Sequence, residues 1–369
     1  LAVVNKAITP EEDEEMPFEG NLVSNSFKEH MFAVSRRWLD PNGDGDPSDG
    51  IDGFRLDVAA EVPQGFWREY RREIRKVNPA AYLVGEVWWQ KWPDSFMDPR
   101  QFLAGDQFDA VMNYRWYRLA RGFFAQAKPI LKPTEFVAGI ERINKNIATD
   151  KLQAMMNVSA SHDTPRLSTS LFNKNMNKYK AKPNDDENYK IHKPDTKTLK
   201  EQKLLLLNQF TFIGAPQIWN GDEVGMWGAD DPDCRKPMWW DDITYKKEKA
   251  HYLEDKERPE DEIKINTNLL SFYRALTRMR TSHPVLTDGD LEFIVANDEA
   301  MTLAYRRQNT EAEIIVAFNR SETTQQVEFP ADSDYEVVLE TAPNSIKREG
   351  EKITLELEGL EGIAIRKQQ

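Results

Sequence analysis

The chain has 369 residues, of which 40% are hydrophobic and 11% aromatic, so it can bury one large core and a smaller one, and this argues against wholesale disorder. Its 62 acidic residues outnumber 49 basic ones, and a net charge of −13 disfavours nucleic acid and anionic membrane surfaces as partners. No apolar run approaches the ~20 residues of a membrane-spanning helix, and the single cysteine, Cys234, cannot form an internal disulfide.

Strands and helices are expected to alternate from the N-terminus onward. The residues Phe27, Met31, Val34 and Trp38 recur at helical spacing and predict a helix at about 24–38. The elements expected next are a Gly- and Asp-rich loop at 40–50, a buried strand at 51–56, an amphipathic helix at 64–77 and a strand at 81–89. A strand–helix–strand unit of about forty residues is typical of a parallel sheet.

The alternation continues through the middle of the chain and ends near Pro284. The expected elements are a strand at 108–114, a helix at 135–149, a strand at 152–163, a helix at 198–212, a strand after 214 and a helix at 267–281. The Lys-, Asn- and Asp-rich segment 173–195 is expected to be an exposed insertion. Six short alternating runs after Pro284 predict an antiparallel β-sandwich.

Three of the predicted strands end in polar residues. Arg55 and Asp57 close the run GFRLD, Glu86 follows a strand in GEVWW, and His162 and Asp163 end SASHD. In a parallel β/α fold, ligands bind at the carboxyl ends of strands. One such acid alone would be explained by a helix cap or a solvated loop. Three acids on separate strands instead indicate a site.

Two kinds of chemistry use several carboxylates, namely a hard-metal site such as Mg²⁺ and glycoside hydrolysis by a nucleophile and a proton donor. Arg55 favours the second. It lies two residues before Asp57, so both side chains point to the same side of a strand. A guanidinium there favours an ionised nucleophile and competes with a metal cation. Glu86 lies among Val and Trp residues, and an apolar surround suits a general acid.

The stretches GFRLDVAAEV, GEVWW and SHDTPR resemble three of the four conserved regions of the α-amylase family of glycoside hydrolases, family 13, in the same order. The stretch GAPQIWNGDEVGMWGADDPDCRKPMWW resembles the family's eighth-strand region in its neopullulanase and cyclomaltodextrinase branch. The resemblance implies an α/β fold. The expected domains are the C-terminal part of a (β/α)8 TIM barrel over residues 1–283 and an antiparallel β-sandwich over residues 284–369.

The resemblance also implies roles for single residues. Asp57 resembles the nucleophile, Glu86 the acid/base, and Asp163 the third carboxylate, which holds sugar hydroxyls in the transition state. Arg55 and His162 resemble the residues that line the subsite before the scissile bond. Further candidates for substrate binding are Trp88 and Trp227, by ring stacking, and Asp231, Asp233 and Arg235, which either close the pocket or form a structural ion pair.

The implied activity is retaining hydrolysis of α-glucans such as maltooligosaccharides, cyclodextrins, or fragments of starch or pullulan. No cofactor is required for this chemistry. Transfer of the glycosyl group to another sugar stays open, and so does a non-catalytic, carbohydrate-binding relative. Family analogy alone favours a periplasmic or secreted location.

The sequence departs from the family in two ways. The family's remaining conserved region and its first three strands are absent, and Met16–Asn21 loosely resembles the motif that follows the third strand. We therefore expect the chain to begin after strand three, and to be inactive alone or to pair with the missing half or a second copy. Ala60 stands where the neopullulanase branch usually carries Asn, so the preference between α-1,4 and α-1,6 bonds is open.

The loop at 40–50 resembles the first half of an EF-hand-type calcium loop, with acidic or amide residues at alternate positions. The candidate ligands are Asp40, Asn42, Asp44, Asp46 and Asp49. The twelfth position is Ile51, which lacks the usual bidentate acid. Both a structural calcium ion and a solvated acidic turn without a metal account for this composition.

Overall fold

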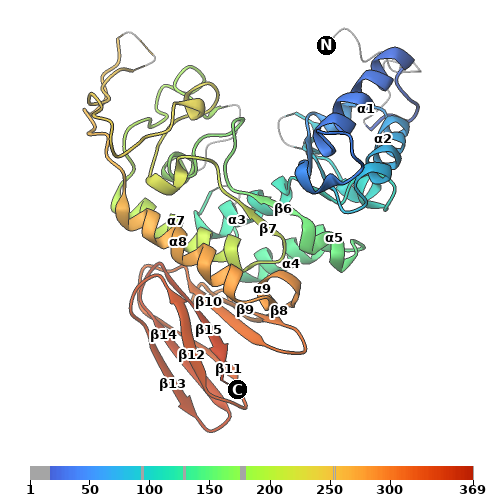
Figure 1. The fold of residues 1–369 in the computed structure, drawn as a ribbon. Coiled ribbons are helices and arrows are strands. Elements are labelled where there is room, and N and C mark those ends of the chain that lie inside the picture. Colours follow the sequence, from blue (N-terminus) through green and yellow to red (C-terminus); the bar gives the residue numbers. More distant parts are fainter. Residues whose placement is uncertain are drawn as a thin grey trace. The chain divides into compact units, whose positions relative to one another are not determined.

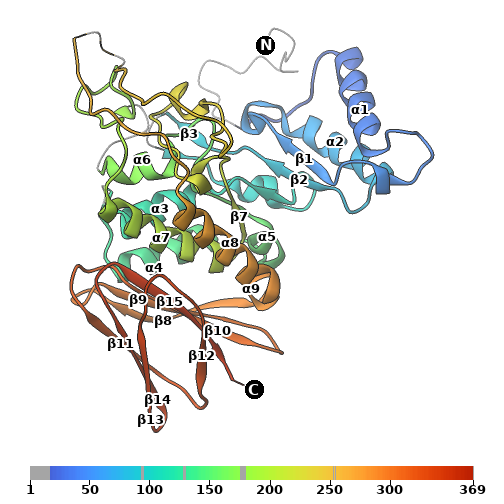
Figure 2. The same ribbon diagram turned by 60° about the vertical axis from the view of Figure 1, so that its left-hand side comes forward.

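The computed structural model describes residues 17–92, 95–127, 130–174, 180–251, 253 and 255–368. Met16, the first residue of the segment that loosely resembles a family motif, lies outside them. The chain divides into two compact units (Figures 1 and 2). The first unit contains residues 1–114 and 146–156, and the second contains residues 115–145 and 157–369.

The first unit is built on a three-stranded parallel sheet in the order β1-β2-β5. Its strands are β1 (Gly53–Leu56), β2 (Tyr82–Gly85), β5 (Ala110–Val111) and the antiparallel pair β3 (Trp89–Lys91) and β4 (Ser95–Phe96). Its α-helices are α1 (Asn25–Leu39), α2 (Gln64–Val77) and α5 (Thr149–Ala154), and its 3₁₀ turns are Pro47–Asp49, Ala59–Glu61 and Pro99–Leu103. Leu56 pairs with Gly85, so β1 and β2 end at the same edge.

The local sequence accounts for these elements. Ser24 caps α1 by accepting a hydrogen bond from the Phe27 N–H at 3.2 Å. The apolar faces of α1 and α2 share one buried cluster with the strands. Gly53 permits the close approach of β1 to β2, because a Cβ there would lie 2.0 Å from the Tyr82 carbonyl oxygen.

Helices and two short strands form the first part of the second unit, although the first residues of α3 and β6, Tyr114 and Met156, are assigned to the first unit. The helices are α3 (Tyr114–Phe124), α4 (Pro133–Asn144), α6 (Leu167–Phe172), α7 (Thr196–Thr211), α8 (Thr267–Ser282) and α9 (Val285–Asp288). The strands β6 (Met156–Val158) and β7 (Ala215–Gln217) form a two-stranded sheet, and 3₁₀ turns cover Asp222–Val224 and Asp233–Arg235. α7 is buried on most of its surface, and the run Leu204–Leu207 is fully buried.

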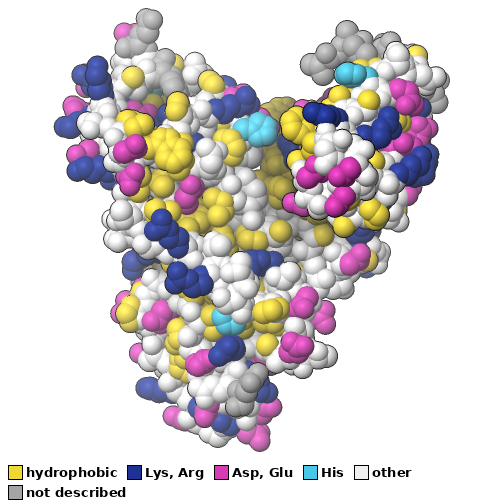
Figure 3. Space-filling model, in the orientation of Figure 1, with side chains coloured by type: hydrophobic (Ala, Val, Ile, Leu, Met, Phe, Trp, Pro, Cys, Tyr) yellow, Lys and Arg dark blue, Asp and Glu magenta, His cyan; other side chains and the backbone are white. Residues whose placement is uncertain are grey.

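The second part of this unit is the predicted antiparallel sandwich. Its five-stranded sheet has the order β12-β15-β10-β9-β8 and its three-stranded sheet the order β11-β14-β13. The strands are β8 (Asp290–Asn297), β9 (Thr302–Gln308), β10 (Glu313–Asn319), β11 (Gln325–Pro330), β12 (Tyr335–Glu340), β13 (Ser345–Glu349), β14 (Lys352–Leu357) and β15 (Glu361–Lys367). β13 and β15 were not among the six predicted runs. Acidic and basic side chains are interspersed on the face of the sandwich seen in Figure 3.

The sandwich packs directly on the helices of its own unit. The ring of Phe124 on α3 lies 5.1 Å from that of Phe318 on β10. Arg307 on β9 is fully buried and donates hydrogen bonds to the carbonyl oxygens of Thr211 and Leu286, at 2.8 and 2.9 Å. Burial lowers the pKa of Arg307 to about 10. The sandwich and these helices therefore share one compact unit.

The middle of the chain differs from the sequence prediction. The strand predicted at 108–114 is only Ala110–Val111, because α3 begins at Tyr114. The predicted helix 135–149 ends at Asn144. Residues 149–154 form α5, so the following strand starts at Met156 instead of 152. Short elements packed end to end leave too few residues for their periodicity to be distinguished.

The segment 173–195 is not the wholly exposed insertion that its composition predicted. In its described part, Ala181, Tyr189 and Ile191 are buried and form a cluster with Ala229. The few apolar residues of the segment were therefore sufficient to attach it to the loop that follows β7, a tertiary contact that composition does not reveal.

Candidate functional site

Two acids in the first unit share one cation at the carboxyl edge of its sheet. The Arg55 guanidinium contacts Asp57 Oδ1 through Nη1 and Glu86 Oε1 through Nη2, the latter at 2.8 Å. Glu86 Oε2 also accepts a hydrogen bond from the Val58 N–H at 3.1 Å. The Asp57 side chain is 72% exposed, whereas that of Glu86 is 10% exposed. The site thus combines an open carboxylate with a buried one.

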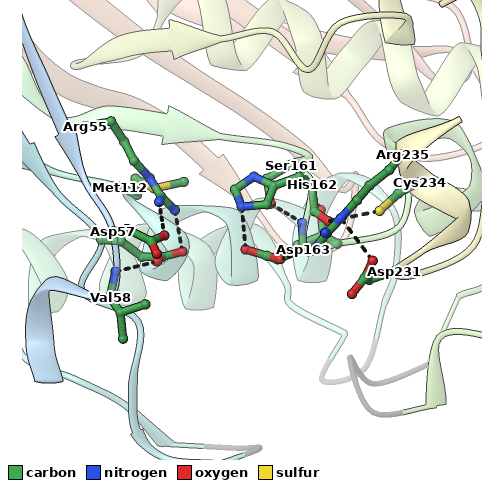
Figure 4. A network of polar contacts seen from close by, with 12 residues as sticks. Arg55, Asp57, Val58, Met112, Ser161, His162, Asp163, Asp231, Cys234 and Arg235 are labelled. Carbon is green, nitrogen blue, oxygen red and sulfur yellow. Dashed lines mark hydrogen bonds and ion pairs between the residues drawn. The ribbon is translucent and has the colours of Figure 1, made fainter. Parts of the chain in front are cut away.

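Strand geometry explains why these groups meet. Asp57 directly follows β1 and Glu86 directly follows β2, and these two parallel strands end in register. Arg55, two residues before Asp57, points to the same side as predicted, and Figure 4 shows its side chain directed at Asp57 and Met112. Gly85 is required beside Glu86, because a Cβ would lie 2.4 Å from the Phe108 ring.

Two features of this group were not predicted. The surround of Glu86 is not only apolar, since Arg55 and the Val58 N–H contact both of its oxygens. Val58 adopts the left-handed conformation with φ 47°, which is uncommon for a β-branched residue and marks local strain. No pattern in the sequence indicates this turn; a Val after a strand-end acid gives no signal for positive φ.

The Trp residues after Glu86 form a series of ring contacts. Trp88 stacks on Tyr114 with centroids 3.8 Å apart and on Trp89 at 4.8 Å. Trp89 in turn meets Trp92 edge-on, and Trp92 is exposed. Neighbouring rings cover surface of Trp88 that a sugar would need, so sugar stacking by Trp88 stays a prediction. Trp92 is the exposed member that sequence analysis did not single out.

A second polar group surrounds Asp163 in the second unit (Figure 4). Asp163 Oδ2 lies 3.0 Å from His162 Nε2, and Oδ1 lies 3.0 Å from Arg235 Nη2. Arg235 Nε donates to the His162 carbonyl oxygen at 2.9 Å and lies 3.0 Å from Asp231 Oδ1. The Ser161 hydroxyl accepts a hydrogen bond from the Asp163 N–H at 3.1 Å. His162, Asp163 and Arg235 are therefore brought together.

Two other candidates from the eighth-strand region have structural contacts instead. Asp233 Oδ2 accepts a hydrogen bond from the Ala229 N–H at 2.6 Å, which favours a role in shaping the loop. Trp227 is 1% exposed and packs edge-on against Trp239, with centroids 4.7 Å apart. This burial is an observation against sugar stacking by Trp227, which stays a prediction.

The candidate residues thus form two local groups, each described within its own unit. Arg55, Asp57 and Glu86 belong to the first unit, and His162 and Asp163 belong to the second. Within each group the residues contact one another. That all three acids meet around one sugar ring stays a prediction.

The acidic loop before β1 uses its side chains to hold its own backbone. Asp40 accepts hydrogen bonds from the Gly43 and Gly45 N–H groups at 2.8 and 3.0 Å. Asn42, Asp44 and Asp46 each accept one from the residue two positions later. Within the described ranges, no group of three or more His, Cys, Asp or Glu is arranged to hold a metal ion. This geometry favours the metal-free turn, and calcium binding, including by Asp49, stays a prediction.

Within the part of the chain that is described, no helix has both the length and the apolar character needed to cross a membrane.

Comparison with known proteins extends over nearly the whole chain. The family model "Alpha amylase, catalytic domain" matches residues 21–289, and "Alpha amylase, C-terminal all-beta domain" matches residues 293–367. A maltogenic alpha-amylase of Bacillus acidopullulyticus is 34% identical over 309 residues, which cover 83% of this chain and 42% of the relative. Neopullulanase 2 of Thermoactinomyces vulgaris is 34% identical over 300 residues, covering 81% and 41%.

Solved structures support the same relationship. A cyclomaltodextrinase structure is 26% identical with a TM-score of 0.70 and covers 97% of this chain and 53% of its own. The native debranching enzyme of Nostoc punctiforme is 25% identical with a TM-score of 0.69, covering 99% and 69%. This chain spans about two fifths of the length of the maltogenic alpha-amylase and of neopullulanase 2. The predicted α/β region followed by an all-β sandwich is confirmed, and the chain belongs to the α-amylase family of glycoside hydrolases.

Proposed function

We propose that the protein is a retaining glycoside hydrolase of α-glucans, with Asp57 as the nucleophile and Glu86 as the acid/base. The observation that carries the proposal is the contact of both carboxylates with the two terminal nitrogens of the Arg55 guanidinium. Retaining enzymes hold their two carboxyl groups about 5–5.5 Å apart, whereas inverting enzymes leave room for a water between them. Two acids on one guanidinium favour the shorter separation.

In the first step, the Asp57 carboxylate attacks the anomeric carbon while Glu86 gives its proton to the departing glycosidic oxygen. The glycosidic C–O bond breaks and an ester bond forms between the sugar and Asp57. The exposure of Asp57 gives a sugar access to this carboxylate. Arg55 and the Val58 N–H contact the two oxygens of Glu86 and so fix the orientation of this carboxyl group.

In the second step, Glu86 takes a proton from water, and the water oxygen attacks the anomeric carbon and releases Asp57. Two inversions leave the α configuration unchanged. Asp163 is proposed to hold sugar hydroxyls in the transition state. Both of its oxygens contact donors, on His162 and Arg235, which keep the carboxylate in one orientation.

The proposed substrate class follows from the relatives. Proteins named maltogenic alpha-amylase, cyclomaltodextrinase and neopullulanase are 33–34% identical to this chain. By analogy with these names, we expect maltooligosaccharides or cyclomaltodextrins to be substrates.

The experiment uses the protein expressed from its complete reading frame, incubated with maltooligosaccharides. Proton NMR of the first product is expected to show the α anomer. Asp57→Asn is expected to lower kcat by at least ~10³-fold, as loss of a nucleophile does. Asp52→Asn is the matched control, because Asp52 is an exposed acid just before the other end of β1. It should leave kcat within about twofold.

Each alternative has its own outcome. A first product with the β anomer, or persisting activity of Asp57→Asn, would overturn the proposed mechanism. Oligosaccharides longer than the substrate would identify glycosyl transfer. Binding of maltooligosaccharides without any product would identify a non-catalytic relative.

A further inference from the structure

The turn that carries Asp163 is fastened to a segment about sixty residues later in the chain. Cys234 Sγ and Arg235 Nε both donate to the His162 carbonyl oxygen, at 3.1 and 2.9 Å. The Gly228 carbonyl oxygen accepts a hydrogen bond from the Arg166 N–H at 3.1 Å. Both flanks of Asp163 are therefore held by residues of the segment 220–235.

The most deeply buried of these attachments is the ion pair of Arg166 and Asp222. Arg166 Nη1 lies 3.1 Å from Asp222 Oδ1 and donates to the Asn220 carbonyl oxygen at 2.9 Å. Asp222 Oδ2 accepts a hydrogen bond from the Leu167 N–H at 3.2 Å, at the first residue of α6. Both side chains are at least 97% buried. Asp222 thus holds the end of the Asp163 turn through a side chain and through the backbone.

The backbone around Asp222 is shaped for this contact. Gly221 has φ +98°, and a Cβ there would lie 2.9 Å from Arg166 Nη1 and 2.3 Å from Met226 Sδ. A glycine is therefore needed for the segment to approach Arg166 this closely.

Stability alone does not account for the pair. Burial raises the pKa of Asp222 to about 6 in spite of the neighbouring Arg166. At neutral pH the ionised pair is therefore maintained against its desolvation, and apolar replacements of such buried pairs are often equally stable or more stable. What the pair does provide is a fixed geometry for the turn that bears Asp163.

We propose that Asp222 and Arg166 are positioning residues, which clamp the 161–167 turn to the 220–235 segment and so set the orientation of Asp163 toward substrate. The inference rests on the proposed function for the role of Asp163. Arg166 and Asp222 themselves do not contact substrate, because both side chains are buried.

The single cysteine offers a readout that does not depend on activity. Cys234 is buried and its thiol donates to the His162 carbonyl oxygen, so it reacts with a disulfide reagent only when this junction opens. We compare Asp222→Asn with Glu201→Gln in the protein expressed from its complete reading frame. Glu201 is the matched control, a buried acid on α7 that is paired with Lys174 and whose pKa burial also raises.

The expected result has two parts. Asp222→Asn should speed the labelling of Cys234 by dithionitrobenzoate at least tenfold under native conditions, and should lower kcat on a maltooligosaccharide at least tenfold with KM changed less than threefold. Glu201→Gln, even with an equal fall in melting temperature, should change neither quantity. If Asp222→Asn does not fold, Arg166→Lys, which keeps the charge but loses the guanidinium fork, should change both in the same direction to a smaller extent.

Every other outcome counts against the clamp or against its premise. Unchanged labelling in both variants would overturn the fastening itself. Faster labelling with unchanged kcat would overturn the positioning of Asp163. Equal effects in Glu201→Gln would show that the pair of Arg166 and Asp222 contributes only to general stability. If the wild-type protein converts no α-glucan, the proposed function fails, and the labelling arm still decides whether the junction is clamped.

Discussion

The two groups of candidate residues are positioned by different means. In the first unit, Asp57 and Glu86 follow two neighbouring parallel strands without an intervening residue, and the strand register brings them together. In the second unit, Asp163 lies five residues after β6, and its turn is held by side chains and carbonyls of the segment 220–235. Local sheet geometry therefore fixes one group, and long-range contacts fix the other.

Among the tests of this comparison, the largest expected effect comes from removing the arginine of each group. Arg55→Met should lower kcat/KM by about 10²–10³-fold, because it takes the shared cation from both proposed catalytic acids. Arg235→Met should cost about tenfold, because Asp163 keeps its contact with His162. Steady-state kinetics on maltooligosaccharides measure both. Equal losses would remove the distinction between the two groups.

A second prediction concerns the stability of the second unit. Arg307→Met should lower the free energy of unfolding by about 2–4 kcal/mol, because it leaves buried carbonyls of Thr211, Leu286 and Gly289 without their donor. Urea denaturation measures the change. The matched control is Arg366→Met, since Arg366 is exposed and pairs with Glu336 on the adjacent strand of the same sheet. A control loss as large as that of Arg307→Met would contradict the proposed anchoring.

The pH dependence of stability tests the clamp in the second unit. The pKa of Asp222 is raised by burial to about 6 from an ordinary 3.8, so the native state binds a proton that the unfolded state has released. The stabilisation that this bound proton gives to the folded state is fully present below the ordinary pKa of 3.8, and it is lost as pH rises through about 6. Between pH 4.5 and 7, wild type should therefore lose about 2 kcal/mol relative to Asp222→Asn.

Denaturation curves at both pH values measure this difference. Arg166 and Glu223 interact electrostatically with Asp222, and so do the buried phenols of Tyr117 and Tyr273. These phenols have raised pKa values and stay neutral in this range. A parallel pH dependence in wild type and variant would show that Asp222 does not titrate near 6.

The comparison also shows what the sequence could predict. Asp57 and Glu86 directly follow apolar runs, and a two-residue spacing put Arg55 beside Asp57, so local pattern was sufficient for the first group. Arg166 and Asp222 are 56 residues apart, and nothing in either local sequence reveals their contact. The burial of Trp227 could not be predicted either, because it depends on contacts with Trp239 and with the residues packed around both rings. The sandwich was predictable as a class from alternation, but not the place of β15 between β12 and β10 in its sheet.

The smallest expected effect concerns the acidic loop of the first unit. Addition and removal of a chelator should change the melting temperature by less than about 1 °C, because the carboxylates of Asp40, Asp44 and Asp46 are engaged by backbone N–H groups of the loop. Asp40→Ala should instead cost about 1 kcal/mol, as loss of a capping acceptor does, with or without calcium. A melting temperature that falls by several degrees in chelator and returns with calcium would show that these oxygens turn from the backbone to a metal ion, and that the entry to β1 depends on a bound cation in addition to its own sequence.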